Sequence, residues 1–379
     1  MLLVILLSLW GALLLPPATY YIWMWKMGQK RNFVTDYDYQ PNVSLIVPTY
    51  NEVSVIEKKL ENIQELDYPR NRLRVIVVDS ASNDGTLEVC KAFLAKNNLR
   101  FPITLISEKE RLGKSHALNF ALKHADGEII ATSDADSFWD RDALRKAVSY
   151  FADPSIGAVT GREKLINIQK SVHTMSEGLY RGFYYTLRLG ESNIHSTLIF
   201  QGELALYRKN AFQEFENKPG YSDDIGTVIN IVSNGYRCIF VPEAVFYDTA
   251  AFSLRGRLML KSRRAEHLIA GVVRSLRLKM EKKLPLSSAV VFFNFYLHVI
   301  SPLFLIVTLL TTAIAYVIDF RFLWFLVFFL VPLFVMEKLR VFAFSYLTSN
   351  IALIMGLLPY ITKKRSAAWQ KIDEMRLKS

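Results

Sequence analysis

Two aspartates, Asp134 and Asp136, stand one residue apart at the end of a short apolar run that begins at Glu128. The run has the length and the partly β-branched composition of a buried strand. Ligands of open α/β sheets bind beyond the carboxyl ends of the strands, so we expect both carboxylates to project into a cleft. Mg²⁺ and Mn²⁺ prefer oxygen ligands and are often held by one or two carboxylates plus substrate phosphates. The pair therefore indicates a metal–diphosphate site, and the alternative interpretation is an acidic cap on a helix or turn.

Carboxylates recur at the ends of successive predicted elements. Besides the aspartate pair, these acids are Glu52, Asp79 and Asp224. Because the carboxyl ends of parallel strands converge on one cleft, acids that are far apart in the sequence become neighbours there. Several acids at the correct ends favour a functional site over chance placement.

Other phosphate and metal motifs are incomplete. Residues Gly113–Ser115 resemble part of a phosphate-binding loop, but Glu108 stands where that motif needs its first glycine. A calcium loop beginning at Asp134 would need an oxygen ligand and a glycine where Phe138 and Trp139 stand. The histidines lack the spacing of zinc ligands. These comparisons leave the carboxylate cleft as the main hypothesis.

The elements that would position these acids alternate between strand and helix. Apolar runs typical of buried parallel strands cover residues 43–48, 73–79, 103–107 and 128–133. Helical spacing is found at residues 53–66, 87–96, 115–124 and 141–151. Further along we expect helices at 171–189, 225–233 and 254–283 and strands at 198–208 and 235–242. This alternation predicts an α/β domain with a parallel sheet.

Both ends of the chain are apolar enough for a membrane. Met1–Trp25 carries no charge and is followed by Lys26, which predicts a transmembrane anchor. The C-terminal third contains three further apolar runs, at residues 288–318, 322–336 and 341–361. The formal net charge is +11, and the Lys and Arg residues crowd beside these segments. Such placement favours contact with anionic lipid headgroups over nucleic acid.

The predicted organisation is an anchor at 1–25, a linker at 26–42, a cytoplasmic catalytic domain at 43–250, basic interfacial helices at 251–287, a transmembrane region of two or three spans at 288–361 and a basic tail at 362–379. Positive residues after the anchor place the domain on the cytoplasmic side, and we expect the plasma membrane. Three later crossings would export the tail, whereas Lys363–Arg365 predicts a cytoplasmic tail. The run 322–336 is the weakest span. Cys90 and Cys238 imply no disulfide framework.

A set of short motifs resembles the inverting family-2 glycosyltransferases, in particular the membrane-embedded branch of hyaluronan, chitin and cellulose synthases. The resemblance runs from Val43 to about Arg264 and rests on Pro48–Glu52, Val78–Gly85, Gly113–Asn119, Asp126–Asp136, Gly157–Gly161, Asp223–Asp224 and Gly235–Ala244. It implies a GT-A-like, Rossmann-type nucleotide-sugar domain held between N-terminal and C-terminal transmembrane helices.

The resemblance also implies how a UDP-sugar donor would be bound. Asp79 corresponds to the acid that accepts the uracil N–H, and Thr49, Tyr50 and Glu52 would shape the same nucleoside pocket. Asp134 would face the nucleotide, and Asp136 would bind Mn²⁺ or Mg²⁺ at the diphosphate. Lys114 would add a second cation beside the cleft, and Gln201 would join the substrate-binding residues.

On the acceptor side, Asp224 corresponds to the general base of the family, which takes the proton of the acceptor hydroxyl. Asp223 replaces the glutamate that precedes this base in the family pattern. Both aspartates can also cap a helix, and the two roles are compatible.

The family's Gln-x-x-Arg-Trp motif corresponds to Lys261–Ala265, in which Lys replaces Gln and Ala replaces Trp. Arg264 matches the arginine, and together with Arg263 it could clamp the departing diphosphate. The alternative is that both arginines contact lipid phosphates. In polymerising relatives the tryptophan supports the acceptor, so its loss bears on processivity.

These features predict a membrane-bound, metal-dependent, inverting hexosyltransferase that moves a sugar from a UDP-sugar to a glycan or lipid-linked acceptor. The number of spans favours a polysaccharide-synthase-like enzyme. The missing tryptophan favours the alternative, a non-processive transferase that acts on a polyprenyl-phosphate lipid. A non-enzymatic membrane scaffold is disfavoured by the acids, and a transporter by the lack of ionisable residues in the spans.

Overall fold

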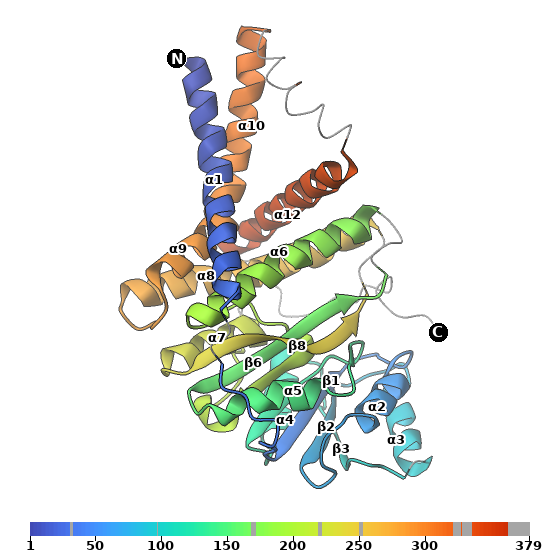
Figure 1. Cartoon of the computed structure of the whole chain (residues 1–379). Coiled ribbons are helices and arrows are strands. Elements are labelled where there is room, and N and C mark those ends of the chain that lie inside the picture. The colour runs from blue at the N-terminus through green and yellow to red at the C-terminus, as the bar shows by residue number, and fades with distance from the viewer. Residues whose placement is uncertain are drawn as a thin grey trace.

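The computed structural model describes residues 1–30, 33–96, 98–167, 172–218, 222–249, 253–320, 327 and 336–362. An α/β domain forms its base, and apolar helices rise from one side (Figure 1). Most of the predicted apolar run 322–336 and the basic tail from Lys363 onward lie outside the described residues.

One eight-stranded sheet carries the domain, in the order β3-β2-β1-β4-β7-β6-β8-β5. The strands are β1 (Val43–Thr49), β2 (Leu73–Asp79), β3 (Ile103–Ser107), β4 (Ile129–Thr132), β5 (Phe138–Trp139), β6 (Ile156–Leu165), β7 (Ala205–Arg208) and β8 (Arg237–Asp248). Strands β1 to β4 run parallel, whereas β7 pairs antiparallel with β4 and β6. The carboxyl ends of β1, β2 and β4 therefore open on the same edge of the sheet.

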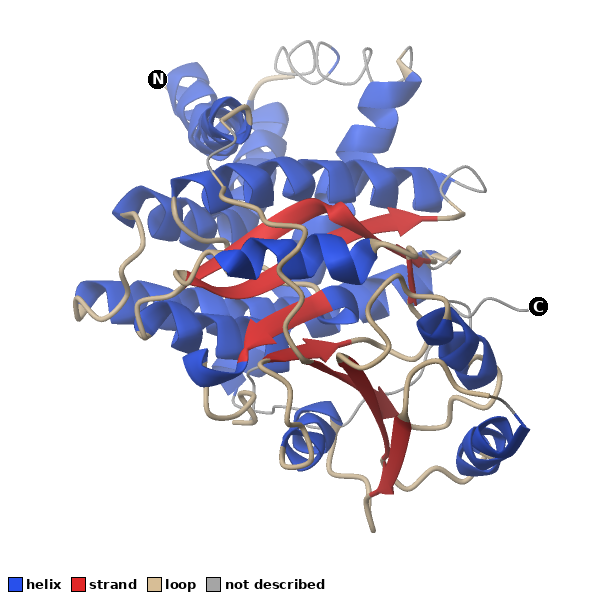
Figure 2. Cartoon of the chain, turned by 60° about the horizontal axis from the view of Figure 1, so that its bottom comes forward, coloured by secondary structure: helices blue, strands red, loops and turns tan. Residues whose placement is uncertain are grey.

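Helices cover both faces of this sheet (Figure 2). They are α2 (Ile56–Gln64), α3 (Thr86–Lys96), α4 (Lys114–Leu122), α5 (Ala143–Val148), α6 (Val172–Ile194), α7 (Asp223–Ser233) and α8 (Leu254–Met280). Alternate side chains of each strand enter different cores, because successive residues of a strand point to opposite faces. Leu45 and Val75 pack in the core beneath α2, α3 and α5, whereas Ile46 and Ile76 pack against α4 and α7.

The GT-A-like α/β fold predicted from the sequence is confirmed, with two differences in detail. The sheet is mixed, because β7 interrupts the parallel order. The strand expected at 198–208 is reduced to β7, since residues Gly202–Leu204 form a 3₁₀ turn. This turn brings the backbone of Glu203 under the loop that follows β4, where its carbonyl accepts hydrogen bonds from Ser133 and Trp139.

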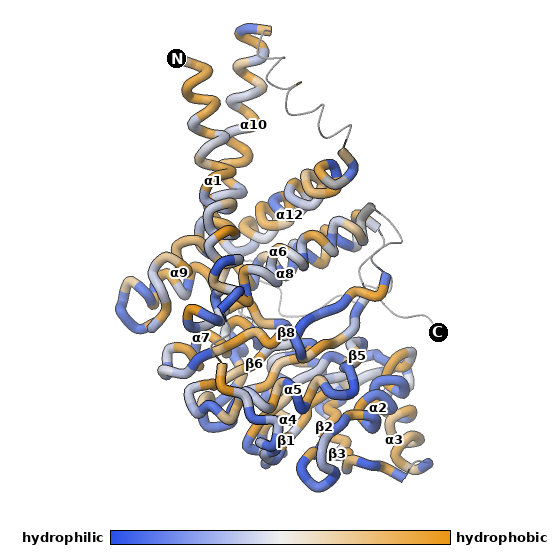
Figure 3. The backbone as a smooth tube through the Cα atoms, viewed as in Figure 1, coloured by the Kyte–Doolittle hydropathy of each residue, from blue (hydrophilic) through white to orange (hydrophobic). Residues whose placement is uncertain are grey.

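In the part of the chain that the structure describes, three helical segments are long and apolar enough to cross a membrane: Leu2–Gly28, Ser288–Ile318 and Leu339–Thr362. They belong to α1 (Leu2–Gly28), to α9 (Ser288–Phe295) and α10 (Ser301–Ile318) joined by a π-helix, and to α12 (Glu337–Thr362). Helices α1 and α10 stand side by side above the sheet, and hydrophobic residues predominate in both (Figures 1 and 3). Helix α12 instead lies obliquely across α6 and α8.

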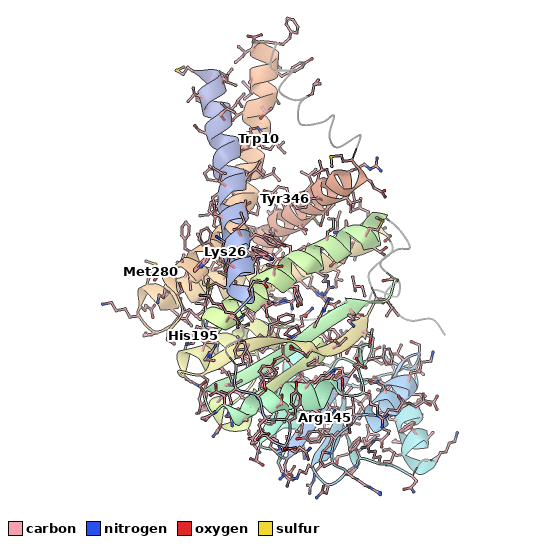
Figure 4. The ribbon with its side chains drawn as sticks, in the orientation of Figure 1. Trp10, Lys26, Arg145, His195, Met280 and Tyr346 are labelled. Carbon is pink, nitrogen blue, oxygen red and sulfur yellow. The ribbon has the colours of Figure 1, made fainter. Side chains whose placement is uncertain are left out.

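Specific side chains join the apolar helices to one another. Trp10 of α1 donates through Nε1 to Thr312 Oγ1 of α10 over 3.3 Å, and Tyr346 of α12 bonds Ser301 of α10 over 3.3 Å. Trp10 on α1 and Tyr346 on α12 are labelled in Figure 4, and both lie above the sheet. These polar contacts fix the helices in register.

A buried carboxylate connects the apolar helices to the α/β domain. Glu191 of α6, only 1% exposed, accepts hydrogen bonds from Tyr20 of α1 (2.5 Å), Asn294 of α9 (2.8 Å) and Thr197 (2.6 Å). One residue earlier along the chain, Gly190 allows α1 and α6 to touch, because a Cβ there would lie 2.4 Å from the carbonyl oxygen of Met24. Burial raises the pKa of the Glu191 carboxyl, while its three donors oppose that rise.

Replacing this carboxylate should loosen the junction. In Glu191→Ala the three donors lose a buried acceptor, so we expect the free energy of unfolding to fall by at least about 2 kcal/mol. Thermal unfolding of the detergent-solubilised protein measures the change, with the exposed substitution Glu61→Ala as control. Equal unfolding midpoints for the two variants would contradict the proposed junction.

Candidate active site

The first part of the site lies where β1 and β2 end. Thr49 and Asp79 are paired across the two strands, and Thr49 Oγ1 donates to Asp79 Oδ1 over 3.4 Å. The second oxygen of Asp79 accepts from the backbone N–H of Ser82 over 3.1 Å. Beside them, the Arg111 guanidinium lies 3.8 Å from the ring centroid of Tyr50. A carboxylate oriented by two donors next to a cation-backed aromatic ring has the chemistry of a base-binding pocket.

Glu52 follows the same strand end and is tied to the next loop. Its backbone N–H bonds Thr86 Oγ1 over 2.7 Å, and its carbonyl accepts from Val55 and Ile56 at the start of α2. The structure therefore brings Thr49, Tyr50, Glu52 and Asp79 together from two adjacent strand ends.

The second part is the turn after β4. Asp134 Oδ1 lies 2.5 Å from the Lys114 ammonium, which in turn lies 3.8 Å from Asp223 Oδ2. Lys114 opens α4 and Asp223 opens α7, so one cation holds a strand end and two helix starts together. Burial with nearby Asp224 and Asp134 raises the pKa of Asp223 to about 6, although Lys114 acts against this rise.

A lysine that the sequence reasoning missed supports this turn from below. Lys59 of α2 is fully buried and donates to Ser133 Oγ and to the carbonyl of Ser137, both over 2.6 Å. Burial lowers the pKa of Lys59 to about 7 even though the charges of Asp134 and Asp136 favour the ammonium form. Its donors span the two ends of the turn and so fix the shape of the Asp-Ala-Asp segment.

The acids of this turn fit a divalent cation by their chemistry. Burial raises the pKa of Asp248, at the end of β8, to about 8, and the charge of Asp136 adds to this rise. The two carboxyl groups therefore lie in one electrostatic environment. Within the described part of the chain, no group of three or more His, Cys, Asp or Glu side chains is placed to hold a metal ion. An ion here would therefore depend on diphosphate oxygens in addition to Asp136, as Mg²⁺ commonly does.

Asp224 is held at the first turn of α7. Its Oδ1 accepts hydrogen bonds from Ser222 Oγ and, over 2.7 Å, from the N–H of Ile225. These bonds give one N–H of the first turn an acceptor and orient the carboxylate. The N-cap is Ser222, so Asp223 and Asp224 stand inside the first turn and the predicted capping role is not theirs. The Asp224 carboxylate lines the cavity described below.

The basic helix α8 contributes the third part. Arg264 lies 3.0 Å from Glu203 of the 3₁₀ turn, and Lys261 lies 3.0 Å from Glu177 of α6. Arg263 lines the same space, and burial with the neighbouring Arg264 lowers its pKa to about 10. The structure thus pairs Arg264 with a carboxylate of the protein, and Glu203 is an acid that the sequence reasoning left without a role.

Gln201 is less open to a ligand than expected. Its side chain donates to Glu163 over 2.5 Å, and its N–H bonds Thr160 Oγ1 over 3.0 Å. It borders the cavity while anchoring β6. Its position therefore suits support of the cavity wall.

A cavity of about 580 Å³ connects these parts. Its walls are formed by α4, α6, α7, α8 and α12 and include Lys114, Asp134, Gln201, Asp223, Asp224, Arg263 and Arg264. At the other end it is bordered by Ser349, Ala352 and Leu353 of the apolar helix α12. Asp79, Asp136 and the Thr49–Glu52 segment lie outside this lining, at the neighbouring strand ends.

The alanine that replaces the family tryptophan has a structural reason. Ala265 of α8 is 4% exposed and touches α12 at Gly356, where a Cβ would lie 2.8 Å from the Ala265 Cβ. Small residues on both helices allow this close crossing. A tryptophan at position 265 would occupy the space that α12 fills.

The sheet, its acidic edge and the adjoining apolar helices have the architecture of GT-A-like glycosyltransferases. The model of the glycosyl transferase family 2 matches residues 44–215. A solved structure of the mannosyltransferase PcManGT from Pyrobaculum calidifontis, in complex with GDP-Man and Mn²⁺, is 32% identical, covers 96% of this chain and all of that chain, and has a TM-score of 0.81. The chain belongs to glycosyl transferase family 2.

Two curated relatives match shorter segments. Beta-monoglucosyldiacylglycerol synthase of Synechocystis sp. is 35% identical over 141 residues, which are 36% of this chain and 29% of that protein. Poly-beta-1,6-N-acetyl-D-glucosamine synthase of Staphylococcus aureus is 24% identical over 217 residues, which are 56% of this chain and 51% of that protein. The chain thus spans about half the length, or less, of these curated relatives.

Removing the lysine beneath the aspartate turn should weaken the metal and donor site. Lys59→Met deletes both hydrogen bonds to the turn, and loss of such outer supports typically costs about 10-fold or more in metal affinity. Titration calorimetry of Mn²⁺ together with a nucleoside diphosphate measures the change. The adjacent, exposed Lys58→Met is the control. Unchanged affinity in a folded Lys59→Met protein would refute the supporting role.

Restoring the family tryptophan should separate α12 from α8. Ala265→Trp forces a large side chain into the crossing at Gly356, and we expect a loss of about 1–3 kcal/mol in stability. Thermal unfolding detects this loss, and Met259→Trp, at a 44% exposed position of α8, is the matched control. An equal effect of both substitutions would argue against close packing at position 265.

Proposed function

We propose that this chain is a membrane-bound hexosyltransferase that transfers one sugar from a nucleoside-diphosphate sugar to a lipid-linked acceptor. The observation that carries the proposal is the continuous cavity between Asp224 and helix α12. It joins acids and cations suited to glycosyl transfer with the surface of an apolar helix. A lipid-borne hydroxyl or phosphate could thus meet a water-soluble donor.

The donor would bind at the ends of β1, β2 and β4. Asp79 can accept a ring N–H of either uracil or guanine, so a UDP-sugar and GDP-mannose are both candidates. The mannosyltransferase similar to this chain over its whole length was solved with GDP-Man, which makes GDP-mannose the first donor to test beside UDP-sugars. Asp136 would hold Mn²⁺ or Mg²⁺, which when bound neutralises charge on the diphosphate.

In the proposed reaction the residues of the cavity divide the work. Asp224, oriented by Ser222 and Ile225, takes the proton of the acceptor as its oxygen attacks the anomeric carbon. Attack from the face opposite the diphosphate gives inversion in a single displacement. The Lys114 ammonium offsets the repulsion between the Asp134 and Asp223 carboxylates, and it places a cation beside the departing diphosphate.

Single transfer is favoured over polymerisation by the crossing of α8 and α12. The aromatic platform of the polymerising relatives is replaced by Ala265, and Gly356 occupies the adjacent space. Without that platform a growing glycan has less support beneath Asp224. We therefore prefer the lipid-linked acceptor, with the catalytic domain on the cytoplasmic side of the plasma membrane.

Nucleotide release tests the enzyme. Native membranes containing the protein, supplied with Mn²⁺ and either GDP-mannose or a panel of UDP-sugars, should release GDP or UDP from one donor. Asp136→Ala and Asp224→Asn should each lower the rate by at least about 100-fold, since they remove the metal ligand and the base. Chelation of the metal should have a comparable effect.

An exposed acid provides the control for these variants. Asp38→Asn lies in the linker before the domain and should leave the rate unchanged. Mass spectrometry of the product distinguishes one added hexose from a polymer. No turnover with any donor, or turnover that survives both site substitutions, would overturn the proposal.

A further inference from the structure

One buried cation of the cavity forms no ion pair with any residue that the structure describes. Arg188 of α6 is 4% exposed and lines the cavity wall. Its Nε donates to the carbonyl of Tyr184 over 3.3 Å, and its guanidinium lies 4.9 Å from the ring centroid of Phe240. Its Nη1 is buried and makes no hydrogen bond to any described residue. A buried N–H of a charged group that lacks an acceptor is costly, so this geometry favours a ligand.

Several other cations around the cavity form ion pairs. Arg181 lies beside Glu163 and Glu177, Arg257 and Lys261 share Glu177, and Arg264 pairs with Glu203. None of the ion pairs among the described residues involves Arg188. Burial lowers the pKa of Arg188 to about 10, so its guanidinium stays charged at neutral pH. Among the described residues, Arg188 therefore has no carboxylate within ion-pair distance, and the charges of Glu203 and Glu191 act on it only from farther away.

Arg188 lies where α6 meets the apolar helices. One turn before it, the Tyr184 hydroxyl bonds His298 Nε2 over 2.7 Å, within the apolar segment Ser288–Ile318. Almost one turn after it, Glu191 binds Tyr20 of α1 and Asn294 of α9. This level is the boundary between the α/β domain and the apolar helices, where the headgroup of an acceptor lipid would lie.

A second open donor faces the same cavity from α8. Arg257 is 2% exposed, and its Nε binds Glu177 over 3.1 Å. Its Nη2 is buried without a hydrogen-bond partner among the described residues. Guanidinium groups bind phosphate oxygens through directional N–H donors, and Arg257 offers a second such donor on the wall of the same cavity.

We propose that Arg188, assisted by Arg257, binds a phosphate group of the acceptor lipid at the membrane end of the cavity. This inference rests on the proposed function and names the acceptor as anionic. Arg188 binds the acceptor, whereas Lys114 and Asp136 serve the donor. An uncharged glycolipid would offer the Arg188 guanidinium no anion.

Binding of a simple phosphate lipid tests the site without turnover. The full-length protein in neutral-detergent micelles is titrated with dodecyl phosphate, and with dodecanol and inorganic phosphate as comparison ligands. Wild type should bind dodecyl phosphate, and Arg188→Gln should bind it about 10-fold or more weakly. Arg188→Lys, which keeps the charge but loses the planar donors, should fall between them.

Two measurements separate this site from the donor site and from general loss of fold. The affinity for the donor nucleotide with Mn²⁺ should be the same in Arg188→Gln and wild type. The exposed Arg162→Gln, which removes a cation from the neighbouring strand β6, should leave the affinity for dodecyl phosphate unchanged. Thermal unfolding verifies that each variant is folded. If Arg188→Gln is not folded, Arg188→Lys is compared with wild type instead.

Several outcomes overturn the inference. These are equal binding of dodecyl phosphate by wild type and a folded Arg188 variant, equally tight binding of dodecanol or of free phosphate, and a weaker donor affinity in Arg188→Gln. The binding experiment needs no turnover, so its result can be told apart from a failure of the proposed function. Lipid-phosphate binding that depends on Arg188 without turnover of any donor would overturn only the function, and turnover with binding independent of Arg188 would overturn only this inference.

Discussion

The ammonium group of Lys114 connects the two halves of the site. It lies between Asp134, which ends the β4 turn, and Asp223, which opens the helix that carries Asp224. The approach is close enough that a Cβ on Gly202 would lie 3.1 Å from the Lys114 nitrogen. Without this cation, buried carboxylates of the same charge would repel one another across the cavity. The distance between the donor turn and the proposed base is thus set by one shared counter-ion.

The parallel part of the fold could be predicted from sequence because its signal is local. The apolar runs of β1, β2 and β3 and the acids that follow them are continuous in the chain, and strand direction alone brings Asp79 and Asp134 to one edge. Lys59 escaped notice because its polar side chain lies in an ordinary amphipathic helix. Only the packing of α2 against the β4 turn makes it a buried hydrogen-bond donor.

Residues whose roles depend on contacts between distant segments were harder to predict from the sequence. Glu203 stands in a stretch that favours a strand, and its role appears only when the 3₁₀ turn places it against Arg264 of α8. Arg188 was one basic residue in an aromatic-rich helix, and that it forms no ion pair with a described residue depends on where all neighbouring acids lie. Ala265 departed from the family pattern, and the departure became intelligible through Gly356, which is distant in sequence.

The contact between Gly190 and Met24 packs the N-terminal helix α1 directly against α6, which lines the cavity of the candidate site. At that point the backbones of α1 and α6 touch, and Tyr20 reaches the Glu191 carboxylate one residue further along α6. Helix α1, which is apolar enough to cross a membrane, is therefore also a packing partner of the α/β domain. A truncated protein lacking residues 1–28 would expose the apolar side of α6 and strip Glu191 of one donor. Soluble fragments of this enzyme should accordingly be designed by covering that face of α6, because trimming the chain up to the linker removes half of a packed interface.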